Sequence, residues 1–214
     1  MSNYKLVLFD MDGTLLKKRT FFVIAEQYGF TDQLMMILKS EKKPYEKTIA
    51  IASLLKGLKK KDLLDLFHKI PFQEDVELVL TELHRREIIT AIASDSYQFA
   101  ADDLKDRLGI NYAFANDLII KDGIVTGDIA IRNSQLHEDS IDHQIYSNCK
   151  SDILEELCSS LHLSLEETIA IGDGIVDRGM LTRAGLGIAF HAPEKVLKHA
   201  DIMITRMRTL LDFI

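Results

Sequence analysis

Three short apolar runs, each followed at once by a polar residue, constrain the fold of this chain more than any other feature. The runs and the residues that follow them are 5–9 before Asp10, 88–93 before Ser94, and 168–172 before Asp173. Short apolar runs of this kind are typical of buried strands. Helical periodicity fills the sequence between and after them, so strands alternate with helices. Such alternation produces right-handed crossovers. We therefore predict an α/β fold built on a doubly wound parallel sheet.

The expected elements divide the chain into a core and an insertion. Residues 16–72 show amphipathic helical stripes without a strand, which predicts a helical cap domain inserted into an α/β core domain of residues 1–15 and 73–214. The expected strands are 4–10, 88–93, 113–115, 168–172, 187–190 and 202–204, with a hairpin over 118–127 that turns at Asp122-Gly123. The expected core helices are 76–86, 97–108, 150–162, 176–184 and a closing helix through Leu210 and Leu211.

Composition excludes several classes of partner. The formal net charge is −7, and a field of that sign repels nucleic acid and anionic membrane surfaces. No run reaches the roughly 18 apolar residues that a membrane span needs. The chain begins Met1-Ser2-Asn3-Tyr4 with no basic leader, and its 2 cysteines, Cys149 and Cys158, fit a reducing compartment. We therefore expect a cytoplasmic protein.

The polar residues after the strands predict one site for phosphate chemistry. Ligands bind where the carboxyl ends of parallel strands open onto a crevice, so Asp10, Ser94 and Asp173 are expected to converge there. Asp10 can attack phosphorus and form an aspartyl-phosphate, provided that cations neutralise the phosphoryl oxygens. Mg²⁺ suits this role because it prefers one or two carboxylates together with phosphate oxygens, and Asp173 is the natural second carboxylate ligand beside Asp10. Asp12, two residues further on, can protonate the leaving alkoxide and later deprotonate water.

Three further residues complete the predicted site. Ser94 and the backbone N–H groups after it can bind a phosphoryl oxygen, and Lys150 at the start of a helix can supply positive charge. Asp177 can orient that lysine or a metal-bound water. Each residue alone has an ordinary explanation as a turn, cap or surface residue. Their combination, each after a predicted strand or at a helix start, favours a function.

The same residues resemble the motifs of the haloacid dehalogenase superfamily. Asp10-Met11-Asp12-Gly13-Thr14 is similar to its first motif, Asp-x-Asp-x-Thr, and Ser94, Lys150 and the segment 172–177 match the second, third and fourth motifs in order. This resemblance implies a Rossmann-like core with a helical cap. It also implies Asp10 as the nucleophile, Asp12 as the acid and base, and Mg²⁺ held by Asp10, the backbone carbonyl of Asp12, and Asp173.

Within the superfamily, the chain looks most like the phosphoserine phosphatase subfamily, from which it departs at several positions. Arg19 aligns with a glutamate that holds the ammonium of serine, and Ile51 aligns with an arginine that grips its carboxylate. Asp95 replaces a glycine beside Ser94, and Val176 replaces an asparagine. Losing both contacts to the amino acid argues against phosphoserine as the substrate. Arg19, with Lys17 and Lys18, indicates either a further anionic group on the substrate or a solvated basic turn.

We therefore predict a Mg²⁺-dependent phosphomonoesterase that acts on a small phosphorylated metabolite. Ser94, Asp95, Lys150 and Arg19 are its candidate phosphate- and substrate-binding residues. A phosphotransferase or phosphomutase that uses the same aspartyl-phosphate is an alternative, and a catalytically idle binding protein is a weaker one. The protein is expected to be a monomer or a homodimer, the latter through pairing of the hairpin at 118–131.

Overall fold

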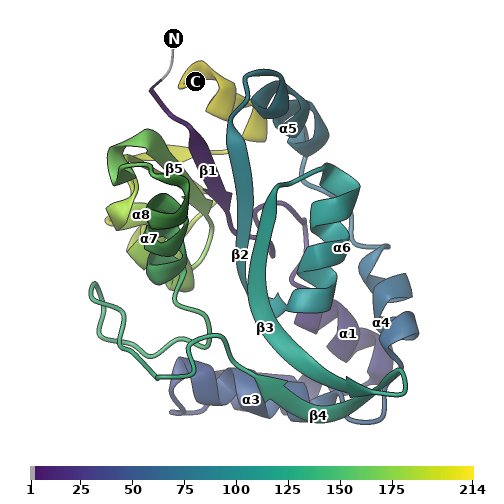
Figure 1. Cartoon of the computed structure of the whole chain (residues 1–214). Coiled ribbons are helices and arrows are strands. Elements are labelled where there is room, and N and C mark those ends of the chain that lie inside the picture. The colour runs from purple at the N-terminus through teal and green to yellow at the C-terminus, as the bar shows by residue number, and fades with distance from the viewer. Residues whose placement is uncertain (1–2) are drawn as a thin grey trace.

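A seven-stranded sheet forms the centre of the computed structural model, which describes residues 3–214 (Figure 1). Its order is β4-β3-β2-β1-β5-β6-β7, and every neighbouring pair is parallel except β3 and β4. The strands are β1 (Leu6–Phe9), β2 (Ile89–Tyr97), β3 (Tyr112–Lys121), β4 (Ile124–Ala130), β5 (Thr168–Gly172), β6 (Leu186–Phe190) and β7 (Ile202–Ile204). The predicted α/β class is confirmed. Residues 1 and 2, which were assigned to the core domain, lie outside the described part.

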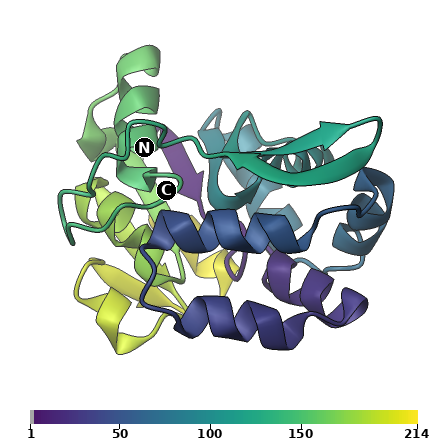
Figure 2. The same ribbon diagram turned by 90° about the horizontal axis from the view of Figure 1, so that it is seen from below.

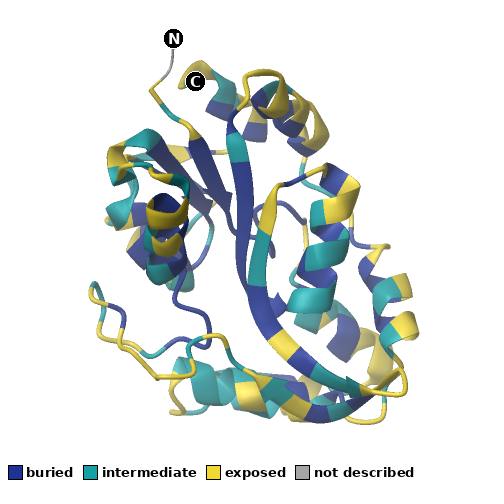
Figure 3. Ribbon diagram, viewed as in Figure 1, coloured by how far each residue is buried: buried dark blue, intermediate teal, exposed yellow. Residues whose placement is uncertain are grey.

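Helices cover both faces of this sheet because successive side chains of a strand point to opposite faces. Val7 and Phe9 pack under α5 (Val76–Arg85), α6 (Gln98–Leu108) and the 3₁₀ helix η3 (Met207–Asp212). Leu6 and Leu8 pack under α7 (Lys150–Leu161), α8 (Arg178–Arg183) and α9 (Glu194–Leu197). The strands between these layers are mostly buried (Figure 3). A strand buried on both faces reads as a continuous apolar run, which is why β1 and β5 were visible in the sequence.

Several predicted elements differ from those in the structure. Residues 113–115 and 118–121 belong to one strand, β3, which crosses Asn116 and Asp117 without a break because its distal half pairs with β4. The predicted helix over 176–184 begins with a 3₁₀ turn, η2 (Ile175–Asp177), before α8. The closing segment is the 3₁₀ helix η3 rather than an α-helix.

Four helices lie between β1 and α5 in the chain and across the carboxyl end of the sheet (Figures 1 and 2). They are α1 (Thr20–Tyr28), α2 (Thr31–Lys39), α3 (Pro44–Leu54) and α4 (Lys60–Phe67). Apolar side chains of α1, α3 and α4 share a cluster with Tyr97, Leu118 and Val125, because α3 packs against β4. The β3–β4 hairpin is therefore an integral support for these helices.

A long connection, residues 131–149, joins β4 to α7. It contacts both the helical insertion, which consists of α1 to α4, and the core. Towards the insertion, Tyr45 N donates to Ile145 O at 3.1 Å. Towards the core, Arg178 pairs with Asp142. Within residues 3–214, each helix is too short or too polar to cross a lipid bilayer.

Candidate functional site

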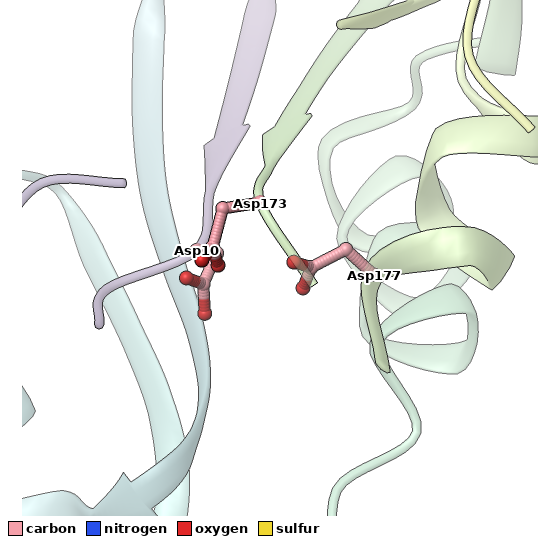
Figure 4. A group of neighbouring side chains, drawn as sticks. All are labelled: Asp10, Asp173 and Asp177. Carbon is pink, nitrogen blue, oxygen red and sulfur yellow. The ribbon is translucent and has the colours of Figure 1, made fainter. Parts of the chain in front are cut away.

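Three carboxylates meet at the carboxyl end of the central strands (Figure 4). Asp10 follows β1, Asp173 follows β5, and Asp177 ends η2. Each offers an oxygen that lies within 4.8 Å of those of the other two. Because β1 and β5 are hydrogen-bonded neighbours, their two ends deliver Asp10 and Asp173 to the same place. Residues that are about 160 positions apart in the sequence thus form one acidic cluster.

Lys150 bonds two of the three carboxylates in this cluster. Its Nζ donates to Asp10 Oδ1 at 2.6 Å and to Asp177 Oδ1 at 2.5 Å. The side chain is almost wholly buried as the first residue of α7. Burial disfavours the charge, but the nearby carboxylates of Asp10, Asp177 and Asp95 outweigh it and raise the pKa of Lys150 above its ordinary value. Lys150 is therefore a fixed cation inside an acidic pocket.

The free oxygens of the cluster belong to two of the three carboxylates. Both oxygens of Asp177 are used, since Oδ2 accepts from Gly174 N at 2.8 Å while Oδ1 accepts from Lys150. In contrast, Asp10 Oδ2 and Asp173 Oδ1 are buried and have no hydrogen-bond partner among the described residues. A buried carboxylate oxygen without a partner is costly. The pair Asp10 and Asp173 therefore fits a divalent cation with oxygen ligands, and Asp177 fits the role of holding Lys150.

Two glycines let these side chains approach the backbone. A Cβ on Gly13 would lie 2.4 Å from Asp173 Oδ2, and Gly13 also has a φ of +104°. A Cβ on Gly172 would lie 2.4 Å from Asp177 Cγ. Glycine is therefore required at these two positions for steric reasons, because any larger residue would displace a carboxylate.

Asp12 stands apart from the cluster and is held by the start of α1. Its Oδ1 accepts from Thr20 N at 2.9 Å and from Thr20 Oγ1 at 2.6 Å. Burial raises the pKa of Asp12 to about 6, with the charge of Asp10 adding to the rise and the Thr20 hydrogen bonds opposing it. A carboxyl with this pKa can both donate and accept a proton near neutral pH.

Ser94 and Asp95 lie in an irregular part of β2. The sequence placed Ser94 at the end of a strand, whereas β2 continues to Tyr97 with a shift in its pairing to β3 between Ala93 and Tyr97. Ser94 lies within this bulge, and its Oγ accepts from Ser96 N at 3.1 Å. Burial raises the pKa of Asp95 to about 7, against the lowering effect of Lys150.

Arg19 precedes α1 and reaches back to the acidic cluster. Its Nη2 donates to Asp173 Oδ2 at 2.7 Å. This contact leaves Asp173 Oδ1 free, so the ion pair and a cation ligand can use different oxygens of the same carboxylate. Burial raises the pKa of Asp173 to about 7; the charge of Asp10 adds to the rise, and Arg19 opposes it.

A cavity of about 240 Å³ opens above these residues, between the strand ends and the helical insertion. Six of the predicted site residues line it: Asp10, Asp12, Arg19, Ser94, Asp95 and Lys150. Asp173 contacts the cavity residue Arg19, and Asp177 contacts Lys150. The structure thus brings all eight predicted residues together.

Several residues of the site escaped the sequence analysis. Asn148 Nδ2 donates to Ser94 O at 2.8 Å, and Asn116 Nδ2 donates to Asp95 O at 2.9 Å. Thr20 holds Asp12, and Lys47 lines the cavity from α3. The position of Asn148, two residues before Lys150, was the one available signal. Thr20 follows Arg19 and lies eight residues after Asp12, whereas Asn116 and Lys47 lie far in sequence from every motif.

A family model described as haloacid dehalogenase-like hydrolase matches residues 7–182 of the chain. The chain belongs to this family. The phosphoserine phosphatase of Methanocaldococcus jannaschii is 35% identical over 216 residues, covering 98% of this chain and 97% of that protein. The phosphoserine phosphatase of Campylobacter jejuni subsp. doylei is 32% identical, covering 94% and 93% of the two chains.

A solved structure has the same architecture as this haloacid dehalogenase-like hydrolase. It is described as a phospho-aspartyl intermediate analogue of phosphoserine phosphatase, and it superimposes with a TM-score of 0.84 at 34% identity over 99% of both chains. The predicted resemblance to the phosphoserine phosphatase subfamily is therefore confirmed.

Proposed function

We propose that this hydrolase cleaves phosphoric monoesters of a small metabolite, with Asp10 as its nucleophile. The observation that carries the proposal is the unpartnered Oδ2 of Asp10, which lies in the acidic cluster at the cavity while Oδ1 is fixed by Lys150. A carboxylate held by one oxygen presents the other in a defined direction, which favours attack on a bound phosphoryl group. The aspartyl-phosphate form of a relative with 34% identity supports the same chemistry here.

Formation and hydrolysis of the aspartyl-phosphate are two steps that share one proton carrier. In the first, an oxygen of Asp10 bonds to phosphorus while the bond to the leaving alkoxide breaks, and Asp12 gives that alkoxide its proton. In the second, Asp12 takes a proton from water, whose oxygen bonds to phosphorus and releases Asp10 and phosphate. The pKa of about 6 at Asp12 suits both transfers. Thr20 orients the carboxyl through Oδ1, which leaves Oδ2 for the substrate.

Mg²⁺ is the cofactor that the site fits, and it would be held by Asp10, by the free oxygen of Asp173 and, by family resemblance, by the backbone carbonyl of Asp12. When bound, it neutralises phosphoryl charge. Lys150 adds a second positive charge beside Asp10, and Asp177 keeps that lysine in place. The Ser94 hydroxyl and the backbone of the β2 bulge bind a phosphoryl oxygen.

The proposed setting is a small phosphorylated metabolite as ligand, with no nucleic acid or membrane partner, in the cytoplasm. A net charge of −7 supports the exclusion of nucleic acid and membrane, since it opposes binding to polyanions. Two buried cysteines that form no disulfide support the cytoplasm as the compartment. Phosphoserine itself is doubtful as the substrate. Arg19 and Ile51 line the cavity at the positions where the subfamily has the glutamate and the arginine that hold the ammonium and the carboxylate of serine. A monomer or a homodimer is compatible with these features.

Replacing the nucleophile tests the proposal. We expect Asp10→Asn to abolish hydrolysis of an aryl phosphate in Mg²⁺, because an amide cannot form the acyl phosphate. Asp106→Asn is the matched control, since Asp106 is 77% exposed and remote from the cavity. Phosphate release by Asp10→Asn near the wild-type rate would rule out the mechanism. Added alcohols should leave phosphate release unchanged, and their phosphorylation would reveal a phosphotransferase.

Asp12→Asn separates the proton carrier from the nucleophile. We expect its rate to fall roughly 10²- to 10⁴-fold for alkyl phosphates, the range typical of general acid–base catalysis. The first step with a nitrophenyl ester should fall less, because nitrophenolate leaves without a proton. Burst kinetics with both esters measure this difference. Equal losses in the first step for the two esters would contradict the role of Asp12 as an acid.

A further inference from the structure

Charge is unevenly distributed around the cavity. The carboxylates that line it are Asp10, Asp12 and Asp95, and all three follow or lie within strands of the core. The wall formed by the helical insertion and the residue before it carries two cations, Arg19 and Lys47, and no carboxylate. The part of a substrate that faces this wall is the alcohol, since the phosphoryl group is at Asp10.

The geometry of α3 explains the composition of this wall. Pro44, Lys47, Thr48 and Ile51 all line the cavity, and their spacing of three, four and seven residues places them on one face of the helix. Phe21 and Leu38 complete the apolar part. On this face of α3, Lys47 is therefore a cation set among mostly apolar side chains, where solvent screens its charge less than in open water.

Both cations are held in place and keep donors free. Lys47 Nζ donates to Leu38 O at 2.9 Å, and an ammonium has three donors. Arg19 Nη2 donates to Asp173 Oδ2, and a guanidinium has five donors. Those two bonds are the hydrogen bonds of these side chains within residues 3–214. Each cation can thus bind a ligand without losing its anchor.

We propose that this wall selects phosphomonoesters whose alcohol carries a second anionic group, a carboxylate or a phosphate, and no ammonium. The inference rests on the proposed function and adds the chemical class of the leaving group. An anion near the wall gains charge-assisted hydrogen bonds from Lys47 and Arg19, whereas an ammonium would meet two like charges. Asp95 does not compensate, because it lies on the opposite, core side of the cavity and burial raises its pKa to about 7.

Esters that share a three-carbon chain and differ in one end group test the proposal. The set is propyl phosphate, 3-phosphonooxypropanoate, propane-1,3-diol bisphosphate and 3-aminopropyl phosphate, with O-phosphoserine as the zwitterion. We expect kcat/KM for the carboxylate or the bisphosphate ester to exceed that for propyl phosphate by roughly 10- to 100-fold, the value of a hydrogen bond to a charged group. Whichever ester is better identifies the second anion. The aminopropyl ester and phosphoserine should fall below propyl phosphate.

Substitutions in the wall test whether its cations cause the preference for anionic esters over propyl phosphate. Lys47→Met keeps the length and apolar stem of the side chain, so we expect it to raise KM for the anionic ester and to bring its advantage over propyl phosphate close to one. Arg19→Gln should reduce the same ratio. Lys42→Met is the matched control, because Lys42 is exposed and does not line the cavity, and its ratio should equal that of the wild type.

Binding separates this inference from the proposed function. Calorimetry with Asp10→Asn protein and Mg²⁺ measures the affinity of each ester without turnover, so the wall can be tested whether or not an ester is hydrolysed. Tighter binding of the anionic ester, weakened by added salt and by Lys47→Met, supports the inference. Equal affinity for propyl and anionic esters, or tightest binding of the aminopropyl ester, overturns it. Failure of the wild-type protein to hydrolyse an aryl phosphate would count against the proposed function only.

Discussion

Individual carboxylates in the site differ mainly in what their oxygens contact. Asp177 is fully paired and stays with Lys150, whereas Asp10 and Asp173 each keep one free oxygen. Asp12 and Asp95 are buried away from that pairing, so burial raises the pKa of both. Identical side chains thus acquire different roles through their environment.

Asp95 gives this difference a measurable effect on stability. Its pKa rises from 3.8 to about 7 on folding, so the folded state binds its proton more tightly. The resulting stability is complete below pH 3.8 and is lost as the pH rises through about 7. We expect Asp95→Asn, which cannot ionise, to lose less thermal stability than the wild type between pH 5 and 8. Melting temperatures measured with a chelator present test this.

The exposed Asp106→Asn variant controls for the loss of one negative charge. Its melting curve should follow that of the wild type across the same pH range. Parallel curves for Asp95→Asn and the wild type would show that Asp95 has no raised pKa.

At the scale of elements, one serine connects the helical insertion to the bulge of β2. Thr48 Oγ1 on α3 donates to Ser147 Oγ at 3.1 Å, and Asn116 Nδ2 on β3 donates to the same oxygen at 3.0 Å. Asn116 also holds the carbonyl of Asp95. Ser147 lies in the 131–149 connection, so this segment couples the position of α3 to the bulge of β2.

Removing that hydroxyl is expected to loosen the coupling. Ser147→Ala deletes the acceptor of two hydrogen bonds, each of which contributes about 0.5–1.5 kcal/mol to stability. We expect a lower free energy of unfolding in urea and a lower kcat/KM. Ser134→Ala, an exposed serine of the same connection, is the control. Identical behaviour of the two variants would mean that Ser147 transmits nothing to the site.

At the scale of the whole molecule, we expect the acidic cluster to make the free energy of unfolding depend on a bound cation. Three carboxylates approach one another at the meeting point of β1, β5 and η2, and Lys150 and Arg19 neutralise them only in part. A ligand that binds the folded state alone stabilises it by mass action. The core and the strand ends should therefore resist unfolding better with Mg²⁺ than without.

Thermal unfolding with and without Mg²⁺ measures this linkage. At a concentration 100 times the dissociation constant, we expect about 2.7 kcal/mol of added stability, seen as a higher melting temperature. Asp173→Asn should abolish most of the rise, whereas Asp106→Asn should keep it. A rise reproduced by NaCl of equal ionic strength would indicate screening rather than a site.

Much of the fold was predictable because its signals are local. β1 and β5 are buried on both faces, so their apolar runs and the aspartates that follow them stand out in the sequence. The shape of β3 was not predictable, because its continuity depends on the pairing of Asn116 with Tyr97 of β2 and of Asp117 with Ala130 of β4. The 3₁₀ turn at 175–177 combines a local bond, from Gly174 N to Asp177 Oδ2, with a distant one from Lys150 to Asp177 Oδ1.

The sequence by itself determined the α/β class and the residues that carry the proposed chemistry, since short apolar strands and the motifs after them are encoded within a few neighbouring positions. The tertiary structure alone decided which oxygens are free, that Thr20 holds Asp12, and that Lys47 faces the cavity. Except for Thr20 and Asp12, which are eight residues apart, those features depend on segments far apart in the chain. Their existence depends on how α1, α3 and the strand ends pack together, which no local pattern specifies.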